Sequence, residues 1–169
     1  MDEKEYERIV REIQAASTDE LSALPVLTAD NVRMNASFAT KEEAINACAD
    51  ILIDRGYAFP DYRSDMLERD RSTSVYLGNG VALPHGLDSS KSRIKSSGIC
   101  FIQVPDGVDF DGNTAYLLIG VAGSEDTHLK LLGRIAEILC NEENIHRLRV
   151  AKNAAEVLEI LSLDGLENV

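Results

Sequence analysis

The segment from residue 78 to residue 86, Gly-Asn-Gly-Val-Ala-Leu-Pro-His-Gly, constrains the fold more than any other part of this chain. Its apolar residues 81–83 are typical of a short buried strand. Pro84 ends that strand, because its ring fixes φ and leaves no amide hydrogen for a sheet ladder. Gly86 follows without a Cβ, so we expect open space beyond His85. The pattern places an imidazole at the rim of a sheet, as either a reactive or ligand histidine or an ordinary loop residue.

Length and composition indicate one domain of ordinary size with an aliphatic core. The chain has 169 residues, of which 44% are hydrophobic and none is Trp, and this is enough to bury a core without disulfides. No stretch approaches the roughly 20 apolar residues that span a bilayer. The first residues, Met-Asp-Glu-Lys-Glu-Tyr-Glu-Arg, are too acidic for a signal peptide. We therefore expect a cytoplasmic protein.

The net charge of −12 argues against a nucleic-acid partner, because phosphates attract Lys and Arg. A negative surface favours and accelerates encounters with a basic protein. The same acidity also serves simply to keep a protein soluble. Charge alone leaves these two explanations open.

The three cysteines, Cys48, Cys100 and Cys140, lie far apart in the sequence. They form no Cys-x-x-Cys pair and no spacing with histidine that indicates a metal site. Each has apolar neighbours, so we expect three reduced thiols in the core. We expect neither a bound metal nor another cofactor.

The chain divides into an N-terminal segment, residues 1–24, and a body, residues 25–169. The first segment is charged and helical in character, with Ile9, Ile13 and Leu21 as sparse apolar anchors. It is either a docked accessory helix or a frayed extension, and its pattern indicates no role. No internal repeat, low-complexity tract or Pro/Ser linker interrupts the body, which we take as one domain.

Two helices of the body carry capping signals. Thr40 with Glu43 forms a capping box, and Gly56 stands where a C-terminal cap is expected. Asn153 with Glu156 opens the last helix in the same way. Apolar residues recur at helical spacing in both segments: Ala44, Ile45, Cys48, Ile51 and Leu52 in the first, and Val157, Leu158, Ile160 and Leu161 in the last.

Predicted strands alternate with these helices along the body. Residues 31–36 alternate apolar and polar side chains, as in a half-buried strand. Residues 99–104 and 115–121 are short apolar runs rich in β-branched side chains, which are typical of central strands. The interleaving predicts an α/β or α+β fold, in which helices flank a mixed β-sheet on both faces.

A helix expected over residues 60–70 puts an arginine in an unusual place. Pro60 suits the first turn, where its missing amide hydrogen costs nothing. Tyr62, Met66 and Arg69 follow at spacings of four and three, so they share one face. An arginine on the inward face at a helix end either extends past the core to water or meets an anion.

The strongest helical pattern covers residues 127–139. Its apolar stripe consists of Leu132, Ile135, Ile138 and Leu139. Leu129 and Leu131 flank that stripe. His128 precedes Leu132 by four residues and Ile135 by seven, so it falls on the same face. We expect His128 in the first turn of this helix, directed toward the core.

His85, Arg69 and His128 would together suit a site that handles phosphoryl groups. An imidazole nitrogen can attack phosphorus directly, and arginine offers phosphoryl oxygens a planar fork of donors. Donors at a helix N-terminus add partial positive charge. Spacing alone leaves open whether the three side chains meet.

At this point a resemblance is specific. The segments Met-Leu-Glu-Arg at 66–69 and Ser-Val-Tyr-Leu-Gly-Asn-Gly-Val-Ala-Leu-Pro-His-Gly at 74–86 resemble the phosphorylation-site signature of the enzyme IIA domains of the fructose/mannitol class. These domains belong to the bacterial phosphoenolpyruvate-dependent sugar phosphotransferase system. The resemblance covers residues 27–163, including Thr-His-Leu-Lys-Leu-Leu at 127–132 and Ala-Glu-Val-Leu at 155–158. The stretch that begins at Tyr76 is most similar to the mannitol-specific branch.

The resemblance implies a phosphotransferase component whose phosphorylated residue is His85, with Arg69 and His128 lining the site. His85 would receive its phosphoryl group from the histidine phosphocarrier protein and pass it to a cysteine of enzyme IIB or IIBC. Contact with the membrane would come only through that permease partner. The family's fold, a mixed sheet flanked by helices, agrees with the pattern above.

A mechanism follows as a hypothesis. A backbone carbonyl would accept from Nδ1–H of His85 and direct Nε2 at phosphorus, with a pKa not raised far above about 6.5. Backbone N–H groups near Gly86 would complete the phosphoryl cradle. The hydroxyls of residues 72–74 would touch the phosphoryl group or, as we expect, cap a turn. His146, in a charged helix, is expected at the surface.

Three functions remain to be distinguished. The first is a transport-coupled phosphocarrier of the mannitol type, and the second is a regulatory, nitrogen-type phosphoprotein that controls a partner through its phosphorylation state. The same His85 chemistry serves both, but the Tyr76 stretch favours transport. A hydrolase using His85 as a base would need a nucleophile motif, which the sequence lacks.

Overall fold

The computed structural model describes residues 3–7, 24–123 and 125–161, with the backbone alone for residues 125–129. A five-stranded sheet of order β1-β4-β5-β3-β2 lies at its centre. The strands are β1 (Val32–Arg33), β2 (Tyr76–Gly78), β3 (Val81–Ala82), β4 (Gly98–Phe110) and β5 (Asn113–Ala122). β1 runs parallel to β4 and β3 parallel to β5, whereas β4 with β5 and β2 with β3 are antiparallel. The expected mixed sheet is confirmed.

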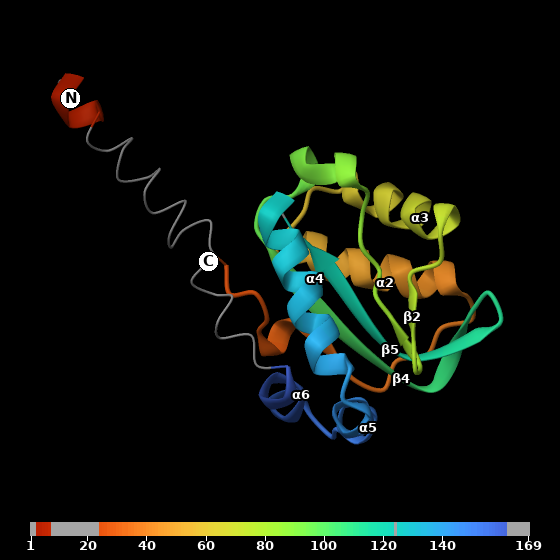
Figure 1. The fold of residues 1–169 in the computed structure, drawn as a ribbon. Helices are drawn as coiled ribbons and strands as arrows, with labels where there is room; N and C mark the ends of the chain where they lie inside the picture. Colours follow the sequence, from red (N-terminus) through yellow and green to blue (C-terminus); the bar gives the residue numbers. More distant parts are fainter. Residues whose placement is uncertain (1–2, 8–23, 124, 162–169) are drawn as a thin grey trace.

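Helices cover both faces of this sheet (Figure 1). On one face lie α2 (Lys41–Asp54) and α3 (Tyr62–Ser72), and on the other lie α4 (Glu125–Leu139), α5 (Glu142–Val150) and α6 (Ala154–Ile160). The structure also has two short 3₁₀ helices, η1 (Ala29–Asn31) and η2 (Asp88–Arg93), and residues 3–7 are helical as well. Successive side chains of β5 point to opposite faces of the sheet. Leu118 therefore packs in the cluster under α2, and Ile119 packs in the cluster under α4.

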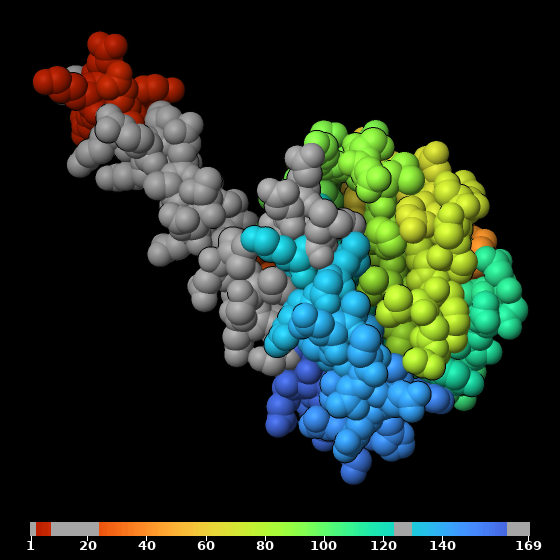
Figure 2. Space-filling view, in the orientation of Figure 1, coloured from red at the N-terminus to blue at the C-terminus, as the bar shows by residue number. Residues whose placement is uncertain are grey.

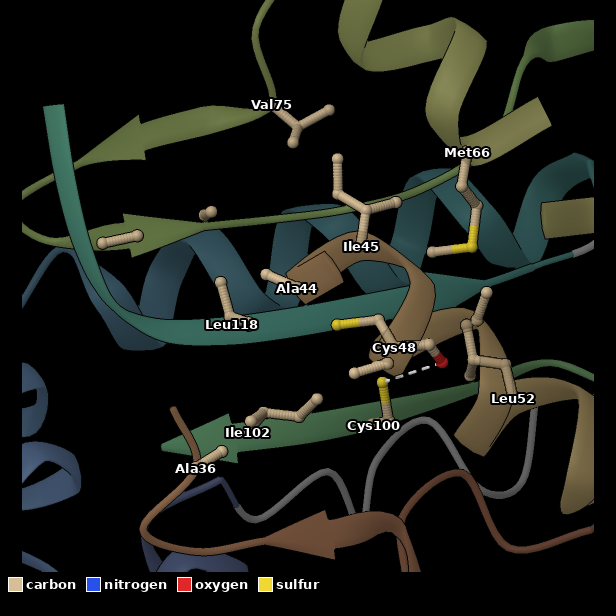
Figure 3. Packing of buried hydrophobic residues seen from close by; sticks show 14 of the residues in the cluster. Ala36, Ala44, Ile45, Cys48, Leu52, Met66, Val75, Cys100, Ile102 and Leu118 are labelled. Atoms are coloured by element: carbon tan, nitrogen blue, oxygen red, sulfur yellow. Dashed lines mark hydrogen bonds between the residues drawn. The ribbon is translucent and has the colours of Figure 1, made fainter. Parts of the chain in front are cut away.

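The layer between α2 and the sheet is closely packed (Figure 3). Cys48 of α2 lies over Cys100 of β4, whose thiol donates to the Cys48 carbonyl oxygen at 3.6 Å. A Cβ on Gly120 of β5 would stand 2.6 Å from the Cys100 sulfur and 2.9 Å from Cβ of Cys48, so the close approach of α2 requires glycine there. Other residues of the same cluster are Ala44, Ile45, Leu52, Met66, Ile102 and Leu118.

Both predicted capping signals are confirmed. The Thr40 hydroxyl accepts from Glu43 N at 3.2 Å, and α2 ends two residues before Gly56, which has φ +89°. Asn153 Oδ1 accepts from Glu156 N at 3.0 Å and opens α6. The helices predicted to begin after Thr40 and after Asn153 are therefore confirmed as α2 and α6.

Other boundaries differ from the prediction for identifiable reasons. The strand expected over residues 31–36 shrinks to β1, because Asn31 lies in η1 and its buried amide donates to the Ile99 carbonyl at 3.0 Å. Strands 99–104 and 115–121 extend into one long hairpin, closed by a turn in which Asp111 and Gly112 have φ +56° and +96°. α3 begins at Tyr62, beyond Pro60, and runs to Ser72.

The prediction of three core thiols is wrong for Cys140. Cys48 and Cys100 are buried, but Cys140 is exposed because α4 ends at Leu139 and Cys140 belongs to the turn that follows. The anchors Ile9, Ile13 and Leu21 lie outside the described residues. Within the described part of the chain, no helix combines the length and apolar character that a membrane crossing needs.

Candidate functional site

His85 lies where β3 leaves the sheet. Its neighbour Leu83 donates to the Val75 carbonyl, the Pro84 carbonyl accepts from Val121 N at 2.9 Å, and His85 forms an isolated parallel bridge to Val121. Hydrogen bonds to the segment before β2 and to β5 therefore fix the backbone as far as His85. The side chain is half-buried, and the predicted rim position is confirmed.

The imidazole is held in one orientation by its own segment. Nδ1 of His85 lies 2.7 Å from the Leu83 carbonyl oxygen. A carbonyl only accepts, so Nδ1 carries the proton and Nε2 is the basic nitrogen of the neutral ring. Burial lowers the pKa of His85, and the charge of Arg69 lowers it further, while the Leu83 bond and Asp88 oppose the shift. The expected carbonyl acceptor is found, and the pKa of His85 is lowered, in line with the expectation that it is not raised far above its ordinary value.

Arg69 lies in the last turn of α3, on the helix face that it shares with buried Tyr62 and Met66. Arg69 as a residue is half-buried, and its Nη1 donates to the Thr73 carbonyl at 2.7 Å in an exposed hydrogen bond. It is near enough to His85 for its charge to lower the pKa of the imidazole. Its charge thus acts on His85, and a direct meeting of the two side chains at one site remains a prediction.

The backbone of α4 starts at the same sheet edge. β5 ends at Ala122, one residue after the His85 bridge to Val121, and α4 begins at Glu125. His128 is in the first turns of that helix, but its side chain lies outside the described residues. The inward orientation of His128 remains a prediction.

The buried face of α4 differs slightly from the predicted stripe. Leu131, Ile135 and Leu139 are fully buried, whereas Leu132 and Ile138 are half-buried. The buried face therefore includes Leu131, which the sequence pattern puts beside the stripe. The spacing of four between its buried residues puts them on one face of the helix.

Two predictions about Gly86 are wrong. The glycine is buried, and a Cβ there would stand 2.4 Å from Cε1 of Tyr62, so the tyrosine ring fills the expected open space. Its N–H donates to the Tyr62 hydroxyl at 2.9 Å and is not available for a phosphoryl cradle. The next N–H, that of Leu87, donates to Ser90 Oγ at 2.9 Å.

The remaining candidates behave as expected. Ser72 Oγ donates to the Glu68 carbonyl at 3.2 Å, and Ser74 Oγ accepts from Tyr76 N at 3.1 Å. The Ser72 bond lies within the last turn of α3, whereas the Ser74 bond caps the turn before β2, as the turn-capping interpretation predicts. Residues 72–74 are exposed. His146 is exposed on α5.

Sequence reasoning missed the role of Tyr62 and Asp65, two buried residues of α3 that hold the segment after His85. Their partners lie 24 and 25 residues away in sequence, so no local pattern reveals them. One signal was available, because Asp65 is an acidic residue beside the inward face of Tyr62 and Met66. A buried carboxylate needs a polar partner.

Known proteins match nearly the whole body of the chain. Residues 25–163 match the family described as "Phosphoenolpyruvate-dependent sugar phosphotransferase system, EIIA 2". The mannitol-specific phosphotransferase enzyme IIA component of Bacillus subtilis is 42% identical over 140 residues, which are 82% of this chain and 98% of that protein.

Solved structures of Escherichia coli proteins agree with the fold. The crystal structure of IIA mannitol is 37% identical, with a TM-score of 0.75, and the match covers 80% of this chain and 99% of that one. The complex of enzyme IIAMTL and phosphorylated enzyme IIBMTL has a chain that is 36% identical, with a TM-score of 0.75 and coverage of 80% and 96%.

Proposed function

The chain belongs to the enzyme IIA family of the phosphoenolpyruvate-dependent sugar phosphotransferase system, and from that membership we propose that it carries a phosphoryl group on His85. The observation that carries the proposal is the 2.7 Å contact between Nδ1 of His85 and the Leu83 carbonyl oxygen. That contact fixes the tautomer in which Nε2 holds the lone pair. Burial keeps the ring neutral by lowering its pKa, so the nucleophile is ready near neutral pH.

The transfer step conserves atoms and charge. Nε2 of His85 bonds to phosphorus as the bond from phosphorus to a histidine nitrogen of the phosphocarrier protein breaks, and that electron pair returns to the donor nitrogen. In the second step a cysteine thiolate of enzyme IIB bonds to phosphorus and the bond to Nε2 breaks. In both steps Nδ1 keeps its proton, which it donates in a hydrogen bond to the Leu83 carbonyl oxygen.

Arg69 and His128 would act on the charge of the moving phosphoryl group. A loose transition state spreads charge over the equatorial oxygens, and the Arg69 guanidinium offers them a fork of donors. His128, in the first turns of α4, would donate to one of them, aided by the positive end of the helix. The proposed transfer uses only protein groups as donors to the phosphoryl oxygens, with no metal and no other cofactor.

The relatives support mannitol as the sugar and enzyme IIB as the acceptor. The similar protein of Bacillus subtilis is named mannitol-specific, and the similar Escherichia coli chain forms a complex with a phosphorylated enzyme IIB. We extend both features to this chain, with residues 25–169 as the carrier domain. This role places the protein in the cytoplasm, with the membrane reached through the permease partner.

A sugar-phosphorylation assay tests this proposal. Vesicles with a mannitol permease (enzyme IIBC) that lacks enzyme IIA receive phosphoenolpyruvate, enzyme I and the phosphocarrier protein, with or without this chain. We expect mannitol phosphate only when the chain is present, and with His146→Ala as well as with wild type. Failure to support mannitol phosphorylation by a chain that is itself phosphorylated would favour the regulatory alternative.

A further inference from the structure

Helix α3 is tied to the segment that contains His85 through a buried tyrosine. The Tyr62 hydroxyl accepts from Gly86 N at 2.9 Å and donates to the Val121 carbonyl at 2.7 Å. Gly86 directly follows His85, and Val121 is the residue to which His85 bridges. Tyr62 is 1% exposed, so one buried hydroxyl joins α3 to the backbone directly after His85 and to β5 at the residue that His85 bridges.

A second tie lies one helical turn along α3. Asp65 Oδ2 accepts from Ser90 Oγ at 2.6 Å and from Arg93 Nη1 at 3.1 Å. Ser90 Oγ in turn accepts from Leu87 N at 2.9 Å. Asp65 and Ser90 are both buried, so this chain of bonds fixes the start of η2, directly after Gly86.

Both ties come from the helix that carries Arg69. Tyr62, Asp65 and Arg69 follow at spacings of three and four, and so lie along one face of α3. Figure 2 shows the surface around β2 and β3, in yellow-green, running between yellow α3 and blue α4. The distance between the guanidinium and the imidazole therefore depends on how α3 is fastened to the segment after β3.

We propose that Tyr62 and Asp65 are positioning residues for phosphoryl transfer, which hold the backbone beside His85 in register with Arg69. The inference rests on the proposed function, because it assigns these residues to the step in which His85 is phosphorylated. In-line transfer needs the nucleophile and the charge-stabilising group in fixed relation, and a misplacement of about 1 Å can cost about a hundredfold in rate.

The hydroxyl of Tyr62 has a role that its ring cannot replace. The ring fills the space beneath Gly86, and a phenylalanine would still fill it. Without the hydroxyl, the Gly86 N–H and the Val121 carbonyl lose their shared partner, and the backbone after His85 is free to shift. Burial raises the pKa of Tyr62, so the hydroxyl stays a neutral donor.

Tyr57 supplies a matched control within the same chain. It is 2% exposed, its ring lies against Gly98, and its hydroxyl donates to the Pro25 carbonyl and accepts from Asn31 Nδ2 at 2.8 Å. The buried environment and the pair of hydrogen bonds therefore parallel those of Tyr62. Its hydroxyl partners, however, precede β1, away from residues 85–93.

The test compares Tyr62→Phe, Ser90→Ala, Tyr57→Phe and wild type in the full chain. Phosphorylation by the phosphocarrier protein is followed in a rapid-quench instrument, and the His85 ring nitrogens are followed by ¹⁵N NMR. We expect Tyr62→Phe and Ser90→Ala to lower kcat at least about tenfold with KM for the phosphocarrier nearly unchanged. Both should also shift the Nδ1 resonance of His85, whereas Tyr57→Phe should change neither reading.

The outcomes separate the two proposals. If wild type accepts no phosphoryl group, the proposed function fails, and this inference fails with it. If wild type is phosphorylated but Tyr62→Phe and Ser90→Ala transfer as fast as Tyr57→Phe, only the positioning role is overturned. Should Tyr62→Phe not fold, Ser90→Ala decides alone, because it removes one hydroxyl from the second tie.

Discussion

His85 has an imidazole whose neutral form is favoured by its surroundings. Burial and the nearby Arg69 lower its pKa below the ordinary 6.5, against the opposing Leu83 bond and Asp88. We expect an NMR titration of the His85 ring protons to give a midpoint below 6.5. A midpoint at or above that value contradicts the proposed balance of burial and charge.

The same shift links His85 to stability with a definite sign. Below pH 6.5 the unfolded chain binds a proton on this residue before the folded chain does. The free energy of unfolding should therefore fall as the pH drops from 6.5 toward the folded pKa, and should not depend on His85 above 6.5. Urea unfolding of wild type and His85→Ala at matched pH values isolates this contribution.

Arg69 is assigned to transfer more than to stability. Arg69 is half-buried, and its guanidinium donates to the Thr73 carbonyl four residues along the chain. We expect Arg69→Ala to slow phosphorylation by about a hundredfold or more, the scale of losing one charge-stabilising donor. Thermal unfolding should move by only a few degrees, and the pKa of His85 should rise. Unchanged transfer kinetics would remove Arg69 from the site.

Two glycines should respond in opposite directions to alanine. A Cβ at Gly86 would meet Tyr62 Cε1 at 2.4 Å, so Gly86→Ala should cost about 1–3 kcal/mol of unfolding free energy. Gly133 lies inside α4 with nothing within 4 Å of an added Cβ, so Gly133→Ala should gain about 0.5–1 kcal/mol. Urea titrations measure both, and a loss at Gly133 would contradict this picture of α4.

At the scale of elements, an ion-pair network joins α2, α3 and the β4–β5 hairpin. Lys41 Nζ lies 2.7 Å from Asp70 and 2.8 Å from Asp111, and Asp70 also accepts from Val75 N at 3.1 Å. Burial opposes the charge on Lys41, but its bonds to Asp111 and Asp70 raise its pKa to about 12. This network fixes the corner where α3 passes into β2.

Removing the lysine should leave Asp70 buried without its cation. We expect Lys41→Met to lower the free energy of unfolding by about 1–3 kcal/mol, less than for a fully buried pair because Asp111 is exposed. The surface pair of Arg134 with Glu137, 3.0 Å apart on α4, provides the control, and Glu137→Gln should cost about 0.5 kcal/mol or less. Equal effects of the two changes in urea unfolding would contradict the assigned burial.

Elements with local signals were the ones that the sequence predicted well. The caps at Thr40 and Asn153 depend on residues three positions away, and both were placed correctly. The extension of β4 to Phe110 was missed, because it depends on pairing with β5 across an irregular stretch between Gln103 and Val108. Pairing of that kind has no counterpart in local periodicity.

At the site, sequence predicted the residues better than their surroundings. The proline-ended strand predicts the place of His85, and the proposed mechanism predicts a backbone-carbonyl acceptor for Nδ1, which the structure identifies as Leu83. Helical spacing puts Arg69 on the inward face of α3 but leaves open whether it meets His85. The ring of Tyr62 under Gly86 does not follow, because it comes from a helix 24 residues earlier in the sequence. Glycine predicts space for a neighbour, but the sequence alone does not say which neighbour occupies it.

For the whole molecule, the sheet topology explains why the site stands where it does. β3 and β5 are parallel, so the His85 segment after β3 and the start of α4 after β5 emerge at one edge of the sheet. α3 approaches that edge from the other face, through Tyr62 and Arg69. Helix α3 from one layer and the start of the α4 backbone from the other therefore lie at the strand ends where the half-buried His85 stands.

The central claim is tested most directly by intact mass spectrometry. The full chain and His85→Ala are each incubated with phosphoenolpyruvate, enzyme I and the phosphocarrier protein, and are weighed before and after brief acid treatment. We predict that wild type gains one phosphoryl group that acid removes, and that His85→Ala gains none. No gain on wild type, or the same gain on His85→Ala, would contradict the account.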